Sequence, residues 1–322
     1  MNVIDGAAAR KRRDEEVDVV VVGSGPAGAA AALALARGGA RVAVVEEGPW
    51  VRPEAFPPDG FSAMAELYRD MGASVMTGRP PMPVLQGRVV GGTSVVNGAI
   101  SWRLPKDVYD EWTAADPALD EALRWTRIER ALDEVESELH IAPTDPAVAG
   151  AHNALLAKGA AGLGLEHRPI ARNVSRCRGL GRCLQGCPAK RKQSMDLSYL
   201  PEACALGAVI FSSTRVDSVR VERGRATAVV ARTAAGAELR LRPRRAVVLA
   251  ASAIQTPALL LRSGMGHGPV GQLLQCHPGV SVAGRFAEPV QLWTGATQGH
   301  EVIGLRGEGL KFEALGYDLP IA

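Results

Sequence analysis

Residues 18–28, Asp-Val-Val-Val-Val-Gly-Ser-Gly-Pro-Ala-Gly, decide the fold of this chain. The β-branched run at the start is typical of a buried parallel strand, and the glycines after it have the spacing GxGxxG. Gly23 permits a tight turn, Gly25 lets the backbone approach a pyrophosphate, and Gly28 lets a helix pack closely on the strand. The pattern predicts a dinucleotide site in which the helix N-terminus faces the phosphates.

The residues that follow complete the same unit. Residues 27–37 are rich in Ala and Leu and predict the helix, and residues 41–45 predict a second strand. Glu46 ends that strand, close to the spacing of about 20 residues at which a carboxylate accepts hydrogen bonds from a ribose diol. The alternative for the glycine motif is a turn that binds no ligand, and the alternative for Glu46 is an ordinary surface carboxylate.

Composition excludes several classes of protein. The chain has 322 residues, of which 47% are hydrophobic and 22% charged, so it has room for two domains and a large core. A net charge of +3 gives no electrostatic case for nucleic acid, and no run reaches the ~20 apolar residues of a membrane span.

Residues 1–16 are polar, resemble no secretory signal and predict a disordered tail. Five cysteines argue against a secreted disulfide framework, so we expect a cytoplasmic protein.

Later segments leave the dinucleotide unit and then return to it. Residues 105–140 predict helices with an amphipathic stripe. A helix over 197–206 and a strand over 209–211 come next, and then a β-meander with strands at 216–221, 226–232 and 237–241. A buried strand at 245–250 and a helix at 256–262 follow. A doubly wound α/β domain with such insertions is more typical of large FAD enzymes than of NAD dehydrogenases.

Two further segments carry a resemblance to a known family. Residues 87–98, Gly-Arg-Val-Val-Gly-Gly-Thr-Ser-Val-Val-Asn-Gly, resemble the first signature of the glucose–methanol–choline (GMC) oxidoreductases. Residues 252–266 resemble their second signature along its whole length, and His277-Pro278 resembles the segment after it. Together with residues 18–28, the matching segments run from residue 18 to about residue 280.

The resemblance implies FAD as the cofactor and assigns residues to its parts. The glycines of the first turn would hold the pyrophosphate, and Glu46 would hold the adenosine ribose. The residues expected at the pyrophosphate and ribityl chain from the second turn are Gly91, Gly92 and Thr93. The residues expected beside the isoalloxazine ring are Asn97, Gly98 and Ala99. The backbone of Val216 would meet the adenine, and Ala251 would lie near the ADP half.

The resemblance also implies a fold class and a division of the chain. The fold is an FAD/NAD(P)-binding, Rossmann-like, doubly wound parallel sheet with a β-meander, plus an incomplete α+β substrate domain. Residues 17–104 and 171–282 would form the FAD-binding domain, and residues 105–170 a helical insertion or cap on the substrate side. Residues 283–322 would begin the substrate-binding domain.

The activity that the resemblance implies is oxidation of the CH–OH group of an alcohol by hydride transfer to flavin N5. The catalytic histidine of the family is expected beyond Ala322, so no residue of this chain is assigned as catalytic, and this chain would carry mainly the flavin-binding part. The acceptor of the electrons can be oxygen, a quinone or another protein. Two alternatives remain open, an NAD(P)-dependent Rossmann dehydrogenase and a catalytically incomplete flavin-binding protein.

Residues 172–192 form a basic, cysteine-rich segment. Cys177, Cys183 and Cys187 have a spacing that loosely resembles a ferredoxin run, but no fourth ligand is evident, so we predict no metal and keep an iron–sulfur or zinc site as the alternative. The seven cations of the segment predict a solvated surface loop, or else a docking patch for an acidic electron acceptor or an anionic substrate. They are Arg172, Arg176, Arg178, Arg182, Lys190, Arg191 and Lys192.

Overall fold

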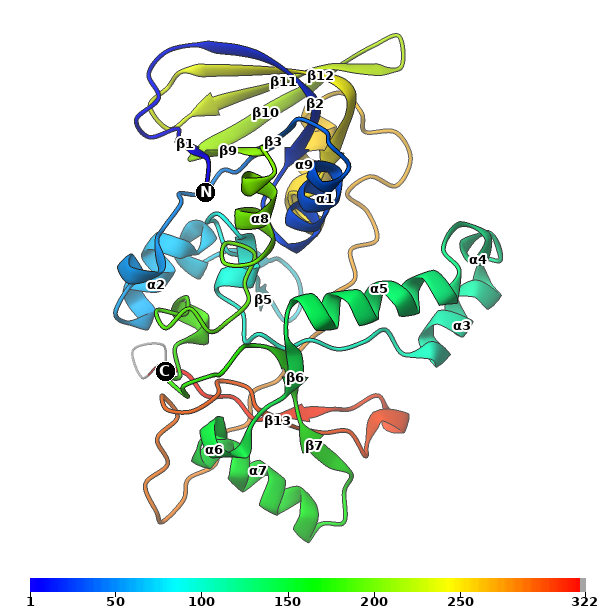
Figure 1. The fold of residues 1–322 in the computed structure, drawn as a ribbon. Coiled ribbons are helices and arrows are strands. Elements are labelled where there is room, and N and C mark those ends of the chain that lie inside the picture. The colour runs from blue at the N-terminus through cyan, green and yellow to red at the C-terminus, as the bar shows by residue number, and fades with distance from the viewer. Residues whose placement is uncertain (319–322) are drawn as a thin grey trace. The chain divides into compact units, whose positions relative to one another are not determined.

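The computed structural model describes residues 1–318, and they divide into two compact units (Figure 1). The first unit comprises residues 1–96 and 194–288, and the second comprises residues 97–193 and the chain from Pro289 onward. The second unit therefore extends beyond the expected insertion 105–170 at both ends. The last residues of the expected segment 283–322, residues 319–322, lie outside the described part of the chain.

A seven-stranded mixed sheet forms the first unit. The strands, in their order across the sheet, are β1 (Val3–Asp5), β9 (Val209–Ser212), β3 (Val42–Val45), β2 (Arg13–Val22), β12 (Glu238–Leu249), β11 (Arg225–Thr233) and β10 (Thr214–Glu222). Neighbouring strands from β1 to β12 are parallel, and β12, β11 and β10 are antiparallel to one another. This confirms the predicted α/β class with a parallel sheet and an attached meander.

Helix α1 (Pro26–Arg37) covers one face of the sheet. Its buried positions are small or apolar and follow helical spacing, and they are Gly28, Ala29, Ala32, Leu33 and Ala36. Small side chains let the helix approach β2, whose residues Val19–Val22 are at most 5% exposed. Helix α8 (Tyr199–Ala205) packs beside α1 (Figure 1).

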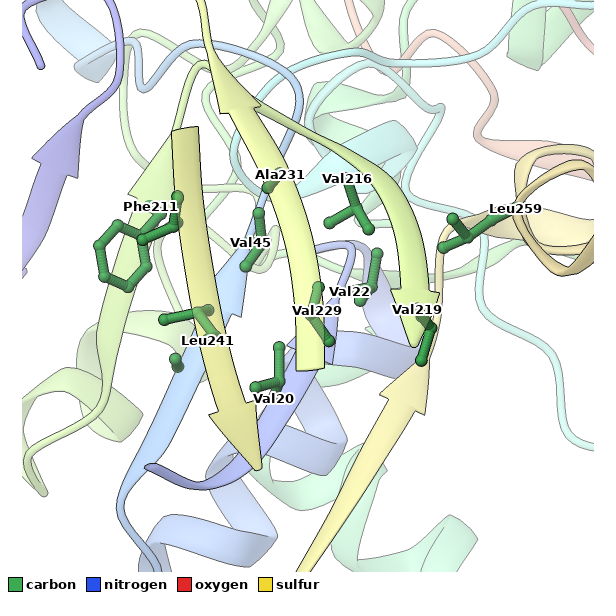
Figure 2. Close-up of a cluster of buried hydrophobic side chains, with 12 residues drawn as sticks. Val20, Val22, Val45, Phe211, Val216, Val219, Val229, Ala231, Leu241 and Leu259 are labelled. Carbon is green, nitrogen blue, oxygen red and sulfur yellow. The ribbon is translucent and has the colours of Figure 1, made fainter. Parts of the chain in front are cut away.

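The opposite face of the sheet is covered by its own meander and by α9 (Ser252–Arg262). Figure 2 shows the side chains of this core gathered between β10–β12 and the parallel strands β2 and β3. Val20, Val229 and Leu241 are fully buried there, and Leu259 reaches the same core from α9. The fold therefore sandwiches β2 and β3 between helices and antiparallel strands, as the continuous valine runs predict.

The third strand of the meander is longer than predicted. The segments predicted as separate strands at 237–241 and 245–250 form the single strand β12. It pairs with β11 over residues 238–241 and with β2 along most of its length. Proline has no N–H to donate to a ladder, and the register with β2 shifts just after Pro243. The irregular pairing accommodates the proline without ending the strand.

The prediction of a disordered tail over residues 1–16 is wrong. Residues 3–5 form β1 and pair with β9, and β2 begins at Arg13. The acidic residues that made the tail look unstructured pair with arginines of β12, since Asp14 binds Arg242 at 2.8 Å and Glu16 binds Arg244. Alternating opposite charges on paired strands therefore extend the sheet into polar sequence.

The first unit also contains a smaller layer between β3 and the second glycine-rich segment. It consists of η1 (Pro53–Ala55), α2 (Gly60–Leu67), η2 (Arg69–Gly72), the hairpin of β4 (Val75–Met76) and β5 (Met82–Pro83), and η3 (Gly92–Val95). Asp59 begins α2 by accepting a hydrogen bond from the backbone N–H of Ser62. Leu67 and Val95 are buried in a separate apolar cluster beneath this layer.

The second unit contains the helices predicted over residues 105–140. They are α3 (Lys106–Ala115), α4 (Ala118–Ala122) and α5 (Trp125–Glu138), and α6 (Pro146–Ala149) and α7 (Ala151–Gly162) follow. β6 (Ile141–Pro143) pairs with β8 (Ala171–Asn173), and β7 (His167–Pro169), β13 (His300–Val302) and β14 (Phe312–Glu313) form a small antiparallel sheet. Short 3₁₀ turns lie at η4 (Cys183–Gln185) and η5 (Arg306–Glu308). Among residues 1–318, no helix has the length and apolar character needed to cross a membrane.

Candidate cofactor-binding site

The first glycine turn is built by two close backbone approaches. Gly23 has a φ of +97°, and a Cβ added to it would lie 2.4 Å from the carbonyl oxygen of Ala250. A Cβ on Gly28 would lie 2.0 Å from the carbonyl oxygen of Gly23. These two glycines therefore serve the shape of the strand–turn–helix unit, as the spacing predicts.

Gly25 differs from its two partners because it faces open space. A Cβ on Gly25 would meet no atom within 4 Å, and its φ of −66° is open to any residue. Gly25 is also the N-cap residue of α1, and no side chain within residues 1–318 caps that end of the helix. The turn thus presents bare backbone and a helix N-terminus, the arrangement that favours a phosphate.

The second glycine turn lies directly against the first. The backbone N–H of Gly91 donates to Oγ of Ser24 at 2.9 Å, and a Cβ on Gly92 would lie 2.8 Å from Cα of Gly25. Both Gly91 and Gly92 have positive φ, +100° and +57°. The fold therefore brings together two glycine turns that are far apart in the sequence.

Glu46 is tied to the first turn. Its Oε2 accepts hydrogen bonds from the backbone N–H of Ser24 at 3.0 Å and from the Ser24 hydroxyl at 2.6 Å, and its Oε1 accepts from the N–H of Gly48 at 2.8 Å. The side chain is only 8% exposed. Burial raises the pKa of Glu46, although the donors Ser24 and Gly48 oppose that rise. The carboxyl group is therefore fixed at the end of β3 beside the glycine turns.

A cleft of about 700 Å³ opens over this arrangement, within the first unit. The predicted site residues that line it are Gly23, Gly25, Glu46, Gly92, Thr93, Val216 and Ala251. Gly28 and Gly91 are not part of the lining, and their close contacts shape the two turns. Asn97, Gly98 and Ala99 belong to the second unit.

The cleft also contains residues that the sequence analysis did not single out. They are Ser24, Glu47, Arg69, Arg215 and Arg262, among others. Arg69 and Glu47 form a partly buried ion pair at 2.7 Å, and Nε of Arg69 is buried without a hydrogen-bond partner in the described chain. The position of Ser24 between two glycines of the motif could have indicated its role in the turn, whereas nothing in the sequence around Arg69 indicates that it lines the cleft.

The segment of Asn97, Gly98 and Ala99 is anchored by hydrogen bonds inside the second unit. Nζ of Lys192 donates to the Asn97 carbonyl at 3.0 Å, and Nε of Arg172 donates to the Gly98 carbonyl at 3.1 Å. The Asn97 side chain accepts from the N–H of Ala99 at 3.1 Å, and Ala99 has a φ of +65°. Two cations and a local side-chain bond therefore fix the conformation of this segment.

The prediction of a solvated surface loop is wrong for two of the seven cations. Arg172 is 0% and Lys192 1% exposed, because their side chains turn inward to these backbone carbonyls. Arg176, Arg178 and Lys190 are exposed, as a surface loop requires. A docking patch on this segment would therefore lack two of the charges assigned to it.

The three clustered cysteines do not converge. The sulfur atoms of Cys177 and Cys187 accept hydrogen bonds from the backbone N–H groups of Gly179 and Arg191, and Cys183 accepts from Arg172. Across residues 1–318, no three His, Cys, Asp or Glu side chains gather as a metal site requires. The alternative of an iron–sulfur or zinc site therefore has no ligand set in this structure.

The hydrogen bonds of the Ser24 hydroxyl to Glu46 and to the second turn predict the effect of Ser24→Ala. The substitution leaves the Gly91 N–H without its acceptor and removes one donor to Glu46, so we expect the free energy of unfolding to fall by about 1–3 kcal/mol. Ser212→Ala is the matched control, since the Ser212 hydroxyl is buried without a partner in the described chain and should be nearly neutral to remove. Urea denaturation measures both. Equal effects of the two substitutions would contradict the role given to Ser24.

Burial of Glu46 predicts a pH dependence of stability. Because burial raises the pKa of Glu46, the folded chain binds more protons than the unfolded chain at pH values between the two pKa values. The contribution of Glu46 is therefore largest in acid and is lost as the pH rises through the raised pKa. We expect the free energy of unfolding of wild type, minus that of Glu46→Gln, to fall as the pH rises above about 4, the usual range of a glutamate pKa. A difference that is constant or increases with pH would contradict this assignment.

The parallel sheet, the paired glycine turns and the fixed carboxyl group define a dinucleotide-binding fold. Residues 64–279 match the family described as GMC oxidoreductase, and residues 18–65 match the one described as FAD binding domain. The chain belongs to the GMC oxidoreductases, and FAD is the cofactor of the domain that it contains. The predicted family and cofactor are thereby confirmed.

Curated relatives agree with this assignment. An uncharacterised GMC-type oxidoreductase of Mycobacterium tuberculosis is 40% identical over 272 residues, which are 82% of this chain and 42% of that protein. A GMC-type oxidoreductase of Sinorhizobium fredii is 34% identical, over 80% of this chain and 50% of its own length. A long-chain-alcohol oxidase of Arabidopsis thaliana is 30% identical, over 79% and 35%. The chain spans half or less of the length of these relatives.

Solved structures share the fold. A formate oxidase of Aspergillus oryzae superposes with a TM-score of 0.56 at 19% identity, over 80% of this chain and 48% of that one. A fungal aryl-alcohol oxidase gives a TM-score of 0.55 at 20% identity, over 77% and 48%. At these identities the similarity concerns the fold.

Proposed function

We propose that this chain is the flavin-binding part of an oxidoreductase that acts on the CH–OH group of an alcohol. The observation that carries the proposal is the close contact of Gly92 with Gly25 in the open cleft that the fixed carboxyl group of Glu46 also lines. The family membership and the relatives named as long-chain-alcohol oxidases support the reaction class.

The cleft has the shape and donors that an FAD diphosphate needs. In the proposal, bare backbone at Gly25, Gly92 and Thr93 holds the two phosphates, because glycine exposes N–H groups without a Cβ in the way. Gly23, Gly28 and Gly91 keep the turns in place through their close backbone contacts and the bond to Ser24.

The adenosine half of FAD would lie over the sheet. The carboxyl group of Glu46 would accept from the ribose hydroxyls, and Val216 and Ala251 would face the adenine and the ADP half from β10 and the start of α9. Arg215 also lines this part of the cleft.

The proposed role of Asn97, Gly98 and Ala99 is the one implied by the family resemblance, beside the isoalloxazine ring. Their conformation is held by Arg172 and Lys192, so the backbone groups that face the ring would be preorganised. The chemistry that bound FAD would supply is that of a hydride acceptor for the alcohol carbon. The electron acceptor, whether oxygen, a quinone or a protein, and the cytoplasmic location remain predictions.

The NAD(P)-dependent alternative is less well supported. The FAD binding domain match covers the first glycine turn, and a second turn packed against it is the feature that an uninterrupted Rossmann dehydrogenase does not require. Glu46 does not discriminate, since a ribose-binding carboxylate serves both cofactors.

Anaerobic reduction of the bound flavin tests the reaction class. Because no residue of this chain is assigned as the base, the purified chain is loaded with FAD, freed of excess cofactor and mixed with a long-chain primary alcohol and with imidazole as an external base. We expect the visible flavin absorbance to bleach. Bleaching by NADPH but not by any alcohol would contradict the proposed reaction. Retained flavin that neither donor reduces would favour the catalytically incomplete flavin-binding protein.

A further inference from the structure

Cys183 lies beside two buried cations in the second unit. Nη2 of Arg172 donates a hydrogen bond to the Cys183 sulfur at 3.0 Å, and Nζ of Lys192 donates to the Cys183 carbonyl at 2.7 Å. Both cations are almost completely buried, whereas Cys183 itself keeps part of its surface exposed. Positive charge therefore lies close to the sulfur of a residue that is itself only partly buried.

These charges decide the ionisation of the thiol. Burial alone would raise the pKa of Cys183, but Arg172, Lys192 and then Thr297 lower it, and the net direction is down. A thiolate is the nucleophilic form of cysteine, and it also supplies the counter-charge that a buried guanidinium needs.

One buried donor beside Cys183 is unused, and a second contacts only the thiol. Nη1 of Arg172 is buried and has no hydrogen-bond partner among residues 1–318, and Oγ1 of Thr297 is buried and has only the Cys183 thiol beside it. Thr297 lies against the Cys183 thiol and is 1% exposed. Buried donors without partners are rare in folded proteins and indicate an acceptor to which they can donate. An oxygen atom added to the sulfur would meet that need.

We propose that Cys183 reacts with hydroperoxides and that Arg172 and Thr297 stabilise the resulting sulfenate. In this reaction the thiolate sulfur attacks one peroxide oxygen, so that an S–O bond forms while the O–O bond breaks. The sulfur is oxidised by two electrons and the peroxide is reduced. With hydrogen peroxide the second oxygen leaves as hydroxide and takes the proton of the new S–OH group, which gives water and the sulfenate. The inference does not depend on the proposed alcohol oxidation, because the peroxide is supplied from outside.

The other four cysteines provide internal references. Cys177 and Cys187 accept hydrogen bonds from backbone N–H groups, burial raises the pKa of Cys204, and Cys276 is exposed beside a methionine sulfur at 4.0 Å. If exposure alone governed oxidation, Cys276 would react first. If thiolate character governs it, Cys183 reacts first.

The test is carried out on the wild-type chain, so it does not depend on a variant that folds. The protein is treated with hydrogen peroxide in the presence of dimedone, which traps sulfenic acids, and the labelled cysteines are identified by peptide mass spectrometry. We expect Cys183 to be labelled about tenfold faster than Cys276. Labelling of Cys183 at or below the rate of Cys276 would overturn the proposal.

A conservative variant tests the stabilisation of the sulfenate separately. Thr297→Val should shorten the lifetime of the sulfenate, measured by delayed addition of dimedone after equal extents of oxidation, because loss of the Thr297 hydroxyl also raises the pKa of the thiol and slows its oxidation. Thr294→Val is the matched control, since the Thr294 hydroxyl is exposed and donates to the Gln291 carbonyl at 3.1 Å. A sulfenate lifetime in Thr297→Val equal to that in wild type would overturn the role of Thr297.

Discussion

Gly25→Val is expected to lower the affinity for FAD about 100-fold, which corresponds to roughly 2.7 kcal/mol of binding free energy. The valine side chain would project into the cleft at the point where bare backbone is needed, because a Cβ there meets no protein atom within 4 Å. The backbone angle at Gly25 accepts any residue, so the FAD-free chain should lose less than about 1 kcal/mol of stability. Titration of FAD fluorescence and urea denaturation measure the two quantities.

Gly38→Val is the matched control for this substitution. Gly38 lies at the opposite end of α1, its nearest Cβ contact would be 3.4 Å away, and it is not part of the cleft lining. We expect Gly38→Val to bind FAD as wild type does. Equal affinity of Gly25→Val and wild type would contradict the placement of the diphosphate at this turn.

Unlike Gly25→Val, which should mainly affect FAD binding, Gly28→Ala should destabilise the folded chain itself. Its Cβ would lie 2.0 Å from the carbonyl oxygen of Gly23, so α1 must move away from the turn that it covers. We expect a loss of about 3 kcal/mol in the free energy of unfolding, at the upper end of the usual cost of overpacking, because the obstructing atom belongs to the backbone. FAD affinity should fall as a consequence of the displaced turn. Thermal or urea denaturation measures the loss.

Gly159→Ala is the control for Gly28→Ala. Gly159 lies inside α7, where an added Cβ meets nothing within 4 Å, so the change should stabilise the chain by up to about 1 kcal/mol through helix propensity. The two glycine-to-alanine changes in helices are thus expected to have opposite signs. If Gly28→Ala stabilised the chain as Gly159→Ala does, the close packing of α1 on the first turn would be refuted.

The strand–turn–helix unit could be predicted from the sequence because its signals are local. The valine run, the three glycines and the alanine-rich helix each have a direct physical meaning, and the structure places β2, the turn and α1 as predicted. The two errors in the sheet have a common origin. Charged residues at 13–16 and around Pro243 predict breaks, whereas pairing between distant strands continues both segments as strand.

The candidate site was predictable only in part. Composition and periodicity say nothing about the contact between Gly92 and Gly25, since it is made by a fold that joins distant segments, and the resemblance to the GMC family supplied that expectation. Ser24 and Arg69 were missed because their importance lies in hydrogen bonds to residues far away in the sequence. The inward orientation of Arg172 and Lys192 was missed because cations in a glycine-rich loop usually face solvent.

Isothermal titration of the wild-type chain and of Gly25→Val with FAD, ADP and NAD⁺ tests the central claim most directly. The claim is that the two adjoining glycine turns hold the diphosphate of FAD. It predicts saturable binding of FAD to wild type, competition by ADP, weaker binding of NAD⁺, and a loss of both FAD and ADP binding in Gly25→Val. Binding of FAD that ADP does not displace and that Gly25→Val leaves unchanged would contradict the claim.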